Sequence, residues 1–460
     1  MWAQYMAYVE GTRGKQPRQL FITKNGVLRN EVEKSFGNMG LAFRKRVDTQ
    51  TSFNYQCDER NSPTDDPDEE DENRCKFPLF LTSNEWLDIL DKELPGESFF
   101  TQNEVDERFS SRNSTDLDRG IQVIYARRND VQTEEVIRRE MDYKTFRRSW
   151  PKINARHKSD LGPAMVWREI YTFIKGSVPA LVLNHPNRES MTNRFLDLEQ
   201  YLALPRKQSR LNPEQRKTVF DLYKSYEKVK KDGNYYDSMD IVFNLAGRVT
   251  KFLSKGKAKV SSSYQRLLPI DSLFVDEVQD FTMAELYLLT KLSRDPNNLM
   301  LAGDTAQSIT EGVAFRFTDV RQIFYELFGG IEPDLLQLTH NYRSHSGILR
   351  LAACVVELLY FFFSDSLDKL PPDLGLFDGP KPTVMEVAST EELVLMLHGS
   401  QREASRIEFG AHQVVIVRNE DVKIKLADEF KVDKDWILTV SLRFISCSFI
   451  HSFYISRLIM

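Results

Sequence analysis

Two short apolar runs with a helical stretch between them constrain the fold more than any other feature of this chain. SLFV (272–275) ends at two carboxylates, and NLMLAG (298–303) ends at a third. Residues 282–293, between them, have the apolar period of a helix. A strand, a helix and a second strand in this order form a unit with parallel strands. The sequence therefore predicts an α/β fold built on a parallel sheet.

Further strands are predicted where β-branched and aromatic residues cluster beside turn residues. These runs are 19–23, 77–83, 335–342, 414–419 and 437–440. Helices are expected over 2–10, from 26 to about 46, from about Glu85 and over 346–363. Residues 370–382 are proline-rich and are expected to form a linker or loop.

The segment from 100 to 260 is mainly helical in period, and prolines interrupt it at intervals. Asn212-Pro213-Glu214 predicts a helix start, with Asn212 as the cap. Within the segment, residues 138–158 are basic and aromatic. Such a stretch can follow a phosphate backbone or can be a solvated helix face, and the sequence alone favours neither.

Composition excludes little beyond disorder and a membrane-embedded bundle, because 41% of residues are hydrophobic and 28% are charged. The net charge is −5, whereas a nucleic-acid binder is expected to be basic. The polar insertion 56–75 explains the difference, since residues 65–72 alone supply seven carboxylates and the rest of the chain sums to +2. Net charge therefore does not argue against a nucleic-acid partner.

Cysteine usage and terminal composition indicate a soluble intracellular protein. The four cysteines have no zinc-ligand spacing, and reduced thiols are favoured over a Cys57–Cys75 disulfide. The first residues lack the pattern of a signal peptide, and charged residues break the apolar stretch after 436. We expect no membrane partner.

The carboxylates after the first run have the chemistry needed for phosphoryl transfer to water. That reaction needs an anchor for Mg²⁺ and a group that orients or deprotonates the attacking water. Asp276 is placed to hold the metal and Glu277 to act on the water. Two adjacent carboxylates after a strand can equally be a surface loop.

Two further strings carry polar groups that fit the same chemistry. In GDTAQSI (303–309), Asp304 and Gln307 can reach partners near the neighbouring strand end, although an Asx turn would also explain Asp304. In THNYRS (339–344), Arg343 can pair with a phosphate and Tyr342 can stack on a base. The alternative for this pair is an aromatic residue and an ion pair buried between domains.

In this order and spacing, DEVQD, GDTAQSI and NYRS resemble the second, third and fourth motifs of the UvrD/Rep-like superfamily 1 helicases. RQLFITKNGVLRNEVEKSF, FPLFLTSNEWLDILD and VIVRNEDVKIKLADEF further resemble the helicase-like region of TPR and ankyrin repeat-containing proteins. The resemblance extends from residue 1 to about residue 440.

The resemblance implies a RecA-like (P-loop NTPase) parallel-sheet lobe with a helical insertion, followed by a partial second RecA-like lobe. The implied parts are the start of lobe 1 with the acidic loop (1–100), the mainly helical insertion (101–260), the rest of lobe 1 (261–335), the partial lobe 2 (336–440) and a divergent apolar tail (441–460).

It also implies ATP and Mg²⁺ as cofactors and single-stranded nucleic acid as partner, with DNA expected rather than RNA. Asp276 would coordinate Mg²⁺, Glu277 would activate water and Gln307 would sense the γ-phosphate. Arg343 would contact the γ-phosphate, Tyr342 would stack near adenine and Asp304 would lie at the nucleotide. Residues on the nucleic-acid path would be Thr23 and Lys24, with Thr82, Ser83 and Trp86 as weaker candidates. The alternative for these three is strand-end capping and core packing, and Trp86 is expected in the core.

The family's phosphate loop, G-x-x-x-x-G-K-[ST], has no counterpart in the 460 residues. GTRGKQ (11–16) differs in spacing, and the text after Ser441 departs from the family pattern. We therefore expect the chain to be a fragment at both ends. Three functions follow as hypotheses: an ATP-dependent helicase or translocase region, a catalytically inactive nucleic-acid-binding or scaffold remnant, and a generic metal-dependent phosphohydrolase.

Overall fold

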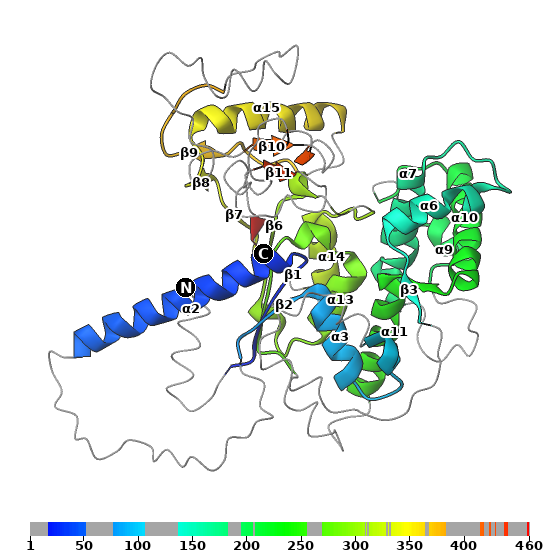
Figure 1. The fold of residues 1–460 in the computed structure, drawn as a ribbon, viewed down its shortest axis with the longest axis horizontal. Helices are drawn as coiled ribbons and strands as arrows, with labels where there is room; N and C mark the ends of the chain where they lie inside the picture. The colour runs from blue at the N-terminus through cyan, green and yellow to red at the C-terminus, as the bar shows by residue number, and fades with distance from the viewer. Residues whose placement is uncertain are drawn as a thin grey trace. The chain divides into compact units, whose positions relative to one another are not determined.

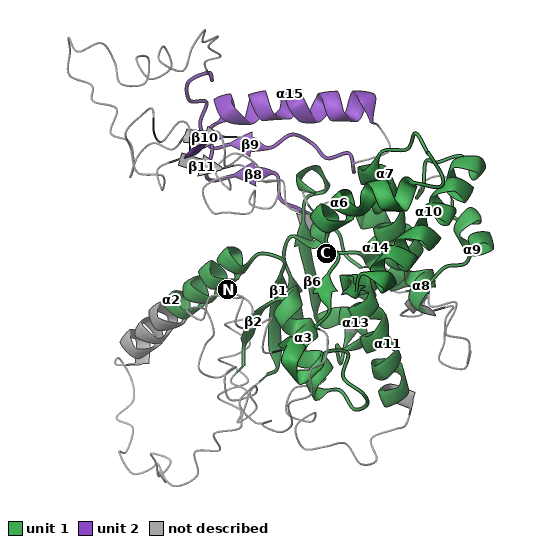
Figure 2. Cartoon of the chain, turned by 45° about the vertical axis from the view of Figure 1, so that its right-hand side comes forward, with its two compact units in different colours: residues 1–336, 458–460 green, residues 337–457 purple. Residues whose placement is uncertain are grey.

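A computed structural model of the chain provides the structure, which divides into two compact units (Figure 2). Unit 1 contains residues 1–336 and 458–460, and unit 2 contains residues 337–457. The described residues are 17–51 (side chains to 39), 77–105, 137–182, 195–205, 208–254, 269–308, 310, 312–327, 330, 333–363, 368–382, 415–417, 423–424, 428, 437–439 and 458–459. The predicted helix 2–10, the acidic insertion, Cys57, Cys75 and most of the tail lie outside these residues.

A six-stranded sheet forms the centre of unit 1, in the order β2-β1-β5-β6-β12-β7. Its strands are β1 (Gln19–Thr23), β2 (Leu79–Thr82), β5 (Ser272–Val275), β6 (Leu299–Gly303), β7 (Leu336–Gln337) and β12 (Leu458–Ile459). The first four run parallel, and β12 pairs antiparallel to β6. The side chains of Leu20, Ile22 and Leu81 are at most 1% exposed, as expected for strands covered on both faces. The predicted parallel sheet is confirmed.

The order in which successive strands are added to the sheet reverses between β1 and β5. From β1, helix α2 (Gly26–Thr51) leads to β2 on one side, whereas from β5, helix α13 (Met283–Lys291) leads to β6 on the other. Since such crossovers are right-handed, the two helices cover opposite faces of the sheet (Figure 1). The carboxyl ends of β1 and β5 therefore form a topological switch point, where open α/β sheets bind ligands.

Two helices that follow strand ends or turns at this edge begin with the same local motif. Helix α3 (Ser83–Glu93) is capped by Thr82 and Glu85, and α13 is capped by Thr282 and Glu285. In each capping box the threonine hydroxyl accepts from the glutamate N–H and the glutamate carboxylate accepts from the threonine N–H. The helices predicted from about Glu85 and over 282–293 are confirmed.

The helical part of unit 1 is a bundle with a small parallel strand pair, β3 (Arg139–Glu140) and β4 (Tyr235–Tyr236). Its helices are α6 (Tyr143–Asn154), α7 (Pro163–Arg168), the π-helix η1 (Glu169–Lys175), α8 (Val178–Val182), α9 (Leu198–Leu202), α10 (Pro213–Asp232) and α11 (Ser238–Ser254). Asn212 caps α10, as predicted. Phe146, Trp167 and Tyr226 pack together in the bundle core.

Short elements complete unit 1 around the sheet edge. The 3-10 turns η2 (Val278–Asp280), η3 (Pro296–Asn298) and η4 (Thr305–Gln307) flank β5 and β6, and helix α14 (Phe317–Leu327) follows. Among the residues that the structure describes, we find no helix that combines the length and the apolar character required to span a bilayer.

Unit 2 contains β8 (His340–Asn341), α15 (Ser346–Phe362), β9 (Leu374–Gly375), β10 (Val415–Val417) and β11 (Ile437–Thr439). The pairs β8–β9 and β10–β11 are parallel. The predicted strands within 414–419 and 437–440 and the predicted helix 346–363 are confirmed.

The prediction of one strand over 335–342 is wrong. The run is divided between β7, which joins the six-stranded sheet, and β8, which pairs with β9. The Asn341 side chain then ends the extended run, because its Oδ1 accepts from the N–H groups of Arg343 (3.0 Å) and Ser344 (2.9 Å). This is the turn-forming behaviour of an asparagine.

Candidate functional site

The carboxyl ends of the parallel strands bring most of the predicted site residues of unit 1 to one edge of the sheet. Thr23 pairs with Thr82 in the register of β1 and β2, and the Asp276 N–H donates to the carbonyl of Ile22 (3.0 Å). Asp304 follows β6 directly. Segments distant in sequence therefore meet at the switch point, although the roles predicted for these residues stay predictions.

Asp276 and Glu277 are both largely buried at this edge, with exposed fractions of 7% and 8%. The Glu277 N–H donates to the Asp276 carboxylate (3.0 Å). Glu277 has a left-handed backbone (φ 55°, ψ 46°), which costs an ordinary residue about 1–2 kcal/mol. Such strain clusters at active sites and ligand clamps, so the backbone at Glu277 favours a functional site over a plain surface loop.

A chain of side-chain hydrogen bonds joins the DEVQD and GDTAQ strings through Gln279. The Gln279 amide donates to the Glu277 carboxylate (2.6 Å), and its carbonyl accepts from the Asp304 N–H (3.0 Å). Gln279 is 1% exposed, so both of its polar ends require partners inside the protein. The position of Glu277 is therefore coupled to the start of the next site loop.

Gly303 allows this close approach. A Cβ atom built at Gly303 would lie 2.4 Å from the Gln279 side-chain oxygen and 2.8 Å from a methyl carbon of Val278. Neither distance is possible for a real Cβ atom, so only glycine fits here. Close packing against Gln279 and Val278 therefore accounts for the glycine at the end of β6.

Asp304 orders the loop that carries Gln307. Its carboxylate accepts from the Ala306 N–H (2.8 Å) and from the Gln307 side-chain amide (2.9 Å). The Asx-type turn is present, and the same carboxylate fixes Gln307. Asp280 holds the same loop further along the chain, because its carboxylate accepts from the Thr310 N–H (3.2 Å).

The residues predicted on the nucleic-acid path also have structural contacts. Thr23 is fully buried, and Lys24 forms an ion pair with Glu285 and lies over the Phe281 ring (4.7 Å). Thr82 caps α3, beside the buried Ser83. Trp86 is in the core, as expected, at 1% exposure.

Tyr342 and Arg343 belong to unit 2, whereas the other predicted site residues belong to unit 1. Both side chains are exposed, Tyr342 by 77%. The turn at Asn341 holds the backbone of Arg343.

A second acidic cluster lies in the helical part of unit 1. Carboxylate oxygens of Glu227, Asp237 and Asp240 lie within 4.8 Å of one another, as metal ligands would. The ammonium groups of Lys175 and Lys230 also contact Asp237, and Lys230 lies 2.7 Å from Asp240. Because lysines already supply the positive charge, this is a buried ion-pair network and not a metal centre.

Comparison with known proteins identifies the family of the chain. The UvrD/REP helicase N-terminal domain family matches residues 87–325, just over half of the chain. This span contains Asp276, Glu277, Asp304 and Gln307. The chain belongs to the UvrD/REP helicase family.

TPR and ankyrin repeat-containing protein 1 of Homo sapiens is 36% identical over 449 residues. The match covers 89% of this chain but 14% of that relative, so the chain spans a small part of the relative's length. The predicted resemblance to both groups of proteins is confirmed. Membership in the helicase family supports a helicase-like function, and members of this family in general bind ATP and nucleic acid.

Sequence reasoning assigned no role to Gln279 or Glu285 of this helicase domain. Gln279 lies inside the DEVQD string, where a polar residue in a buried turn is the available indication of a bonded partner. The role of Glu285 was visible locally, because Thr282-x-x-Glu285 is a capping-box pattern. Its pairing with Lys24, 261 residues away, depends on the sheet topology.

Proposed function

We propose that this chain is the ATP-binding region of a UvrD-like helicase or translocase, which couples ATP hydrolysis to movement along single-stranded DNA. Its RecA-like lobe 1 would be the sheet of unit 1, and unit 2 would be part of a second such lobe. The observation that carries the proposal is the relay from Glu277 through Gln279 to Asp304, at the switch point of a parallel sheet.

The donor set at this edge fits Mg²⁺, because every candidate ligand is an oxygen. Asp276 would hold the ion, with Asp304 at the bound nucleotide. A bound Mg²⁺ would neutralise charge on the β- and γ-phosphates. Glu277 would orient the attacking water and accept its proton, and the hydrogen bond from Gln279 would keep its carboxylate in place.

Gln307 would sense the γ-phosphate, because Asp304 holds its amide and Asp304 is bonded to Gln279. Arg343 would supply a cationic fork to the γ-phosphate, and the exposed Tyr342 would stack near adenine. Thr23, Lys24, Thr82 and Ser83, at the ends of β1 and β2, would lie on the single-strand path.

The 460 residues contain no G-x-x-x-x-G-K-[ST] string, whose backbone N–H groups and lysine would hold the β-phosphate. This absence favours a second candidate function, a non-hydrolysing nucleic-acid-binding or scaffold region. We therefore propose slow or undetectable ATP turnover for the 460-residue polypeptide. Robust turnover stimulated by single-stranded DNA and abolished by Glu277→Gln would contradict that statement and establish the enzyme.

The metal site is tested without relying on turnover. Mn²⁺ replaces Mg²⁺ and can be followed by electron paramagnetic resonance during titration of the purified chain. We expect a Mn²⁺ site that Mg²⁺ competes for, that Asp276→Asn removes and that Glu277→Gln retains. Glu214→Gln, on the exposed start of α10, is the control and should bind as wild type does. Equal Mn²⁺ binding by wild type and Asp276→Asn would refute the assignment.

A further inference from the structure

Helix α15 of unit 2 has one buried side and one exposed apolar side. Leu349 and Ala352 are at most 5% exposed and pack inside unit 2. The opposite side carries apolar residues at the three- and four-residue spacing of a single helix face. This α15 stripe consists of Leu351, Val355, Leu358, Phe361 and Phe362, which are between 49% and 80% exposed, together with the exposed Cys354.

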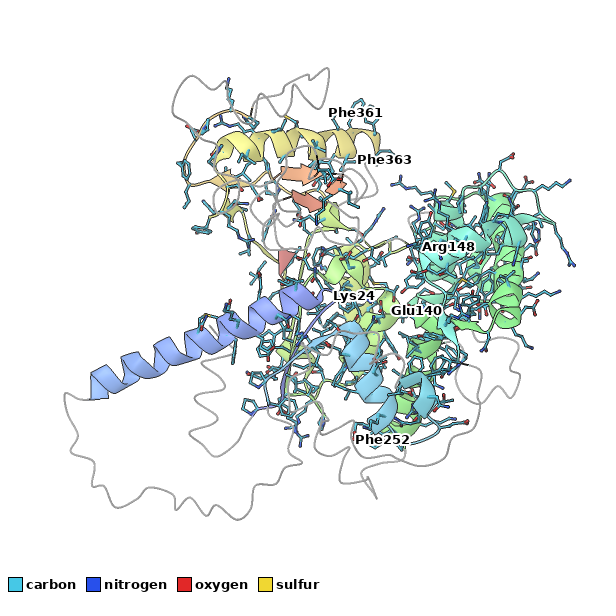
Figure 3. The ribbon with its side chains drawn as sticks, viewed as in Figure 1. Lys24, Glu140, Arg148, Phe252, Phe361 and Phe363 are labelled. Atoms are coloured by element: carbon cyan, nitrogen blue, oxygen red, sulfur yellow. The ribbon has the colours of Figure 1, made fainter. Side chains whose placement is uncertain are left out.

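Exposed apolar side chains continue at both ends of the α15 stripe. Phe363, the residue after the last turn, is exposed, and Figure 3 labels it beside Phe361. At the other end, the segment after β9 packs on the first turn of the helix, because the Ser346 N–H donates to the Phe377 carbonyl (2.9 Å). Leu376 and Phe377 of this segment are exposed beside the start of the helix. We call these three residues and the α15 stripe together the α15 surface.

The size of the α15 surface matches what one subunit contributes to a dimer. At about 200 Å² per side chain, its four phenylalanines expose roughly 500 Å² of apolar area. The largest apolar patch of a typical monomer covers about 300–600 Å² in total. With the exposed leucines and the valine added, the α15 surface approaches the about 800 Å² that each partner buries in a standard interface.

The chemistry of the α15 surface indicates an apolar protein partner. The α15 stripe contains no charged side chain, and the two charged residues of the helix, Arg350 and Glu357, both lie to one side of it. A helix that lies on a membrane has a polar face rich in lysine and arginine opposite its apolar face. The opposite face of α15 carries Leu349 and Ala352 and is buried in unit 2, so α15 has no such polar face.

We infer that the α15 surface joins two copies of this chain in a symmetric dimer, with the two α15 helices antiparallel about a two-fold axis level with Val356. Such an axis places Leu351 opposite Phe361 of the second copy and Cys354 opposite Leu358, so a smaller side chain meets a larger one in each pair. The two-fold axis repeats every contact, so the α15 surface supplies both halves of the interface. This inference does not depend on the proposed ATP site, which belongs to unit 1.

Sedimentation velocity over a concentration series of the purified 460-residue chain measures the self-association. The variant is Leu358→Glu, and the control is Met165→Glu, an exposed apolar residue of α7 with the same change in charge. We expect wild type to form a dimer. Leu358→Glu should raise the dissociation constant about a hundredfold, because each dimer loses two buried leucines. The control should raise it less than about threefold, and both side chains are exposed, so the melting temperatures should stay unchanged.

Cross-linking tests the antiparallel arrangement. Glu357→Cys and Arg350→Cys are each introduced into a chain whose four natural cysteines are replaced by alanine, and bismaleimidohexane is added. Along the helix axis, the two copies of residue 357 would lie about 3 Å apart and those of residue 350 about 18 Å apart. Glu357→Cys should therefore give a covalent dimer, whereas Arg350→Cys should give little.

Four results would overturn the inference. They are a wild-type chain that stays monomeric at every concentration, equal dissociation constants for wild type and Leu358→Glu, equal weakening by Met165→Glu, and equal cross-linking of the two cysteine variants. A fifth would assign the surface to a membrane instead. In that case Leu358→Glu would lose binding to phosphatidylcholine–phosphatidylserine vesicles while its self-association stayed as in wild type.

Discussion

At the scale of single residues, Gly303 is the position where the site tolerates least change. An alanine methyl group would overlap the Gln279 side-chain oxygen and Val278. Overpacking of this kind costs about 1–3 kcal/mol, so we expect Gly303→Ala to lower the free energy of unfolding by that amount in urea denaturation. The change should also separate Gln279 from Asp304.

Gly247→Ala is the matched control, because nothing lies within 4 Å of a Cβ at this position in α11. Removing a glycine from a helix interior should stabilise the protein by about 0.5–1 kcal/mol. If both variants were equally stable, packing at Gly303 would not be what demands a glycine.

The sequence predicted the edge of the sheet at which the candidate site residues lie, but not the contacts between them. Asp276, Glu277 and Asp304 were predictable because carboxylates followed recognisable strands, and parallel strands end at one edge. The hydrogen bonds of Gln279 and the Lys24–Glu285 ion pair could not be predicted, since each depends on the register of segments far apart in sequence.

At the scale of elements, the π-helix η1 and the glycine that follows it join the helical bundle to the segments that come after the two site strings. The Thr172 hydroxyl donates to the Gly312 carbonyl and accepts from the Ala314 N–H (3.2 Å). The Gly176 carbonyl accepts from the Ala284 N–H (2.8 Å), at the start of α13. π-helical turns are rare overall, but those that occur are often found at functional sites. This fits an element that holds the segment around Gly312 and the start of α13.

We expect Thr172→Val to release the loop around Gly312 while leaving the fold intact. Valine has nearly the same shape, but it removes the partner of the Ala314 N–H and of the Gly312 carbonyl, which belong to half-buried residues, at up to about 1–3 kcal/mol each. Hydrogen exchange of residues 312–316 should become at least about tenfold faster. Thr218→Val, which removes one bond on the surface of α10, is the control and should leave that exchange unchanged.

The ion-pair network between η1, α10 and α11 stabilises the bundle. Asp237 is 1% exposed and accepts from Lys230 (3.0 Å) and Tyr226 (2.6 Å), as well as from Lys175. Removing one partner of a buried ion pair typically costs about 3–5 kcal/mol. We therefore expect Asp237→Asn to destabilise the protein by that amount in chemical denaturation. Asp221→Asn, which removes an exposed ion pair with Lys224 on α10, should change the free energy of unfolding by under about 1 kcal/mol.

The Asp237 carboxylate also makes the stability of the protein depend on pH. Burial alone would raise the pKa of Asp237, but Lys175 and Lys230 lower it below its ordinary value. A lowered pKa contributes stability that is complete above the unfolded value of about 3.9 and is lost as pH falls below it. Wild type should therefore lose stability between pH 4 and pH 2 more steeply than Asp237→Asn, in denaturation curves measured at each pH. Parallel curves would exclude this contribution.

Helices and strands could be predicted where nearby residues determine them. They could not be predicted where pairing with a distant strand determines them. The capping boxes at Thr82 and Thr282 and the cap at Asn212 lie within four residues, so the helix starts could be predicted. The run 335–342 has strand composition throughout, but its two halves take different partner strands. Composition carries no information about such partners.

At the scale of the whole molecule, charge is distributed unevenly along the chain. Residues 65–72 carry seven carboxylates and set the sign of the net charge. Replacing these residues by Asn and Gln should raise the affinity for single-stranded DNA at about 10 mM salt, where charges act over about 30 Å. Anisotropy titrations should show the gain shrinking at 0.15 M salt. An unchanged affinity at 10 mM would mean that the segment does not influence DNA binding.

The pairing of β1 with β5 has a consequence for how the chain is made. Arg18 and Asp271, which flank these strands and share a hydrogen bond, are 253 residues apart. At about 5–20 residues per second, β1 waits on the order of 10–50 s on the ribosome before its central partner exists. During that time an apolar strand has an open edge, which is a template for aggregation. Any product that stops before residue 272 would leave this edge open permanently, so we expect such products to be insoluble.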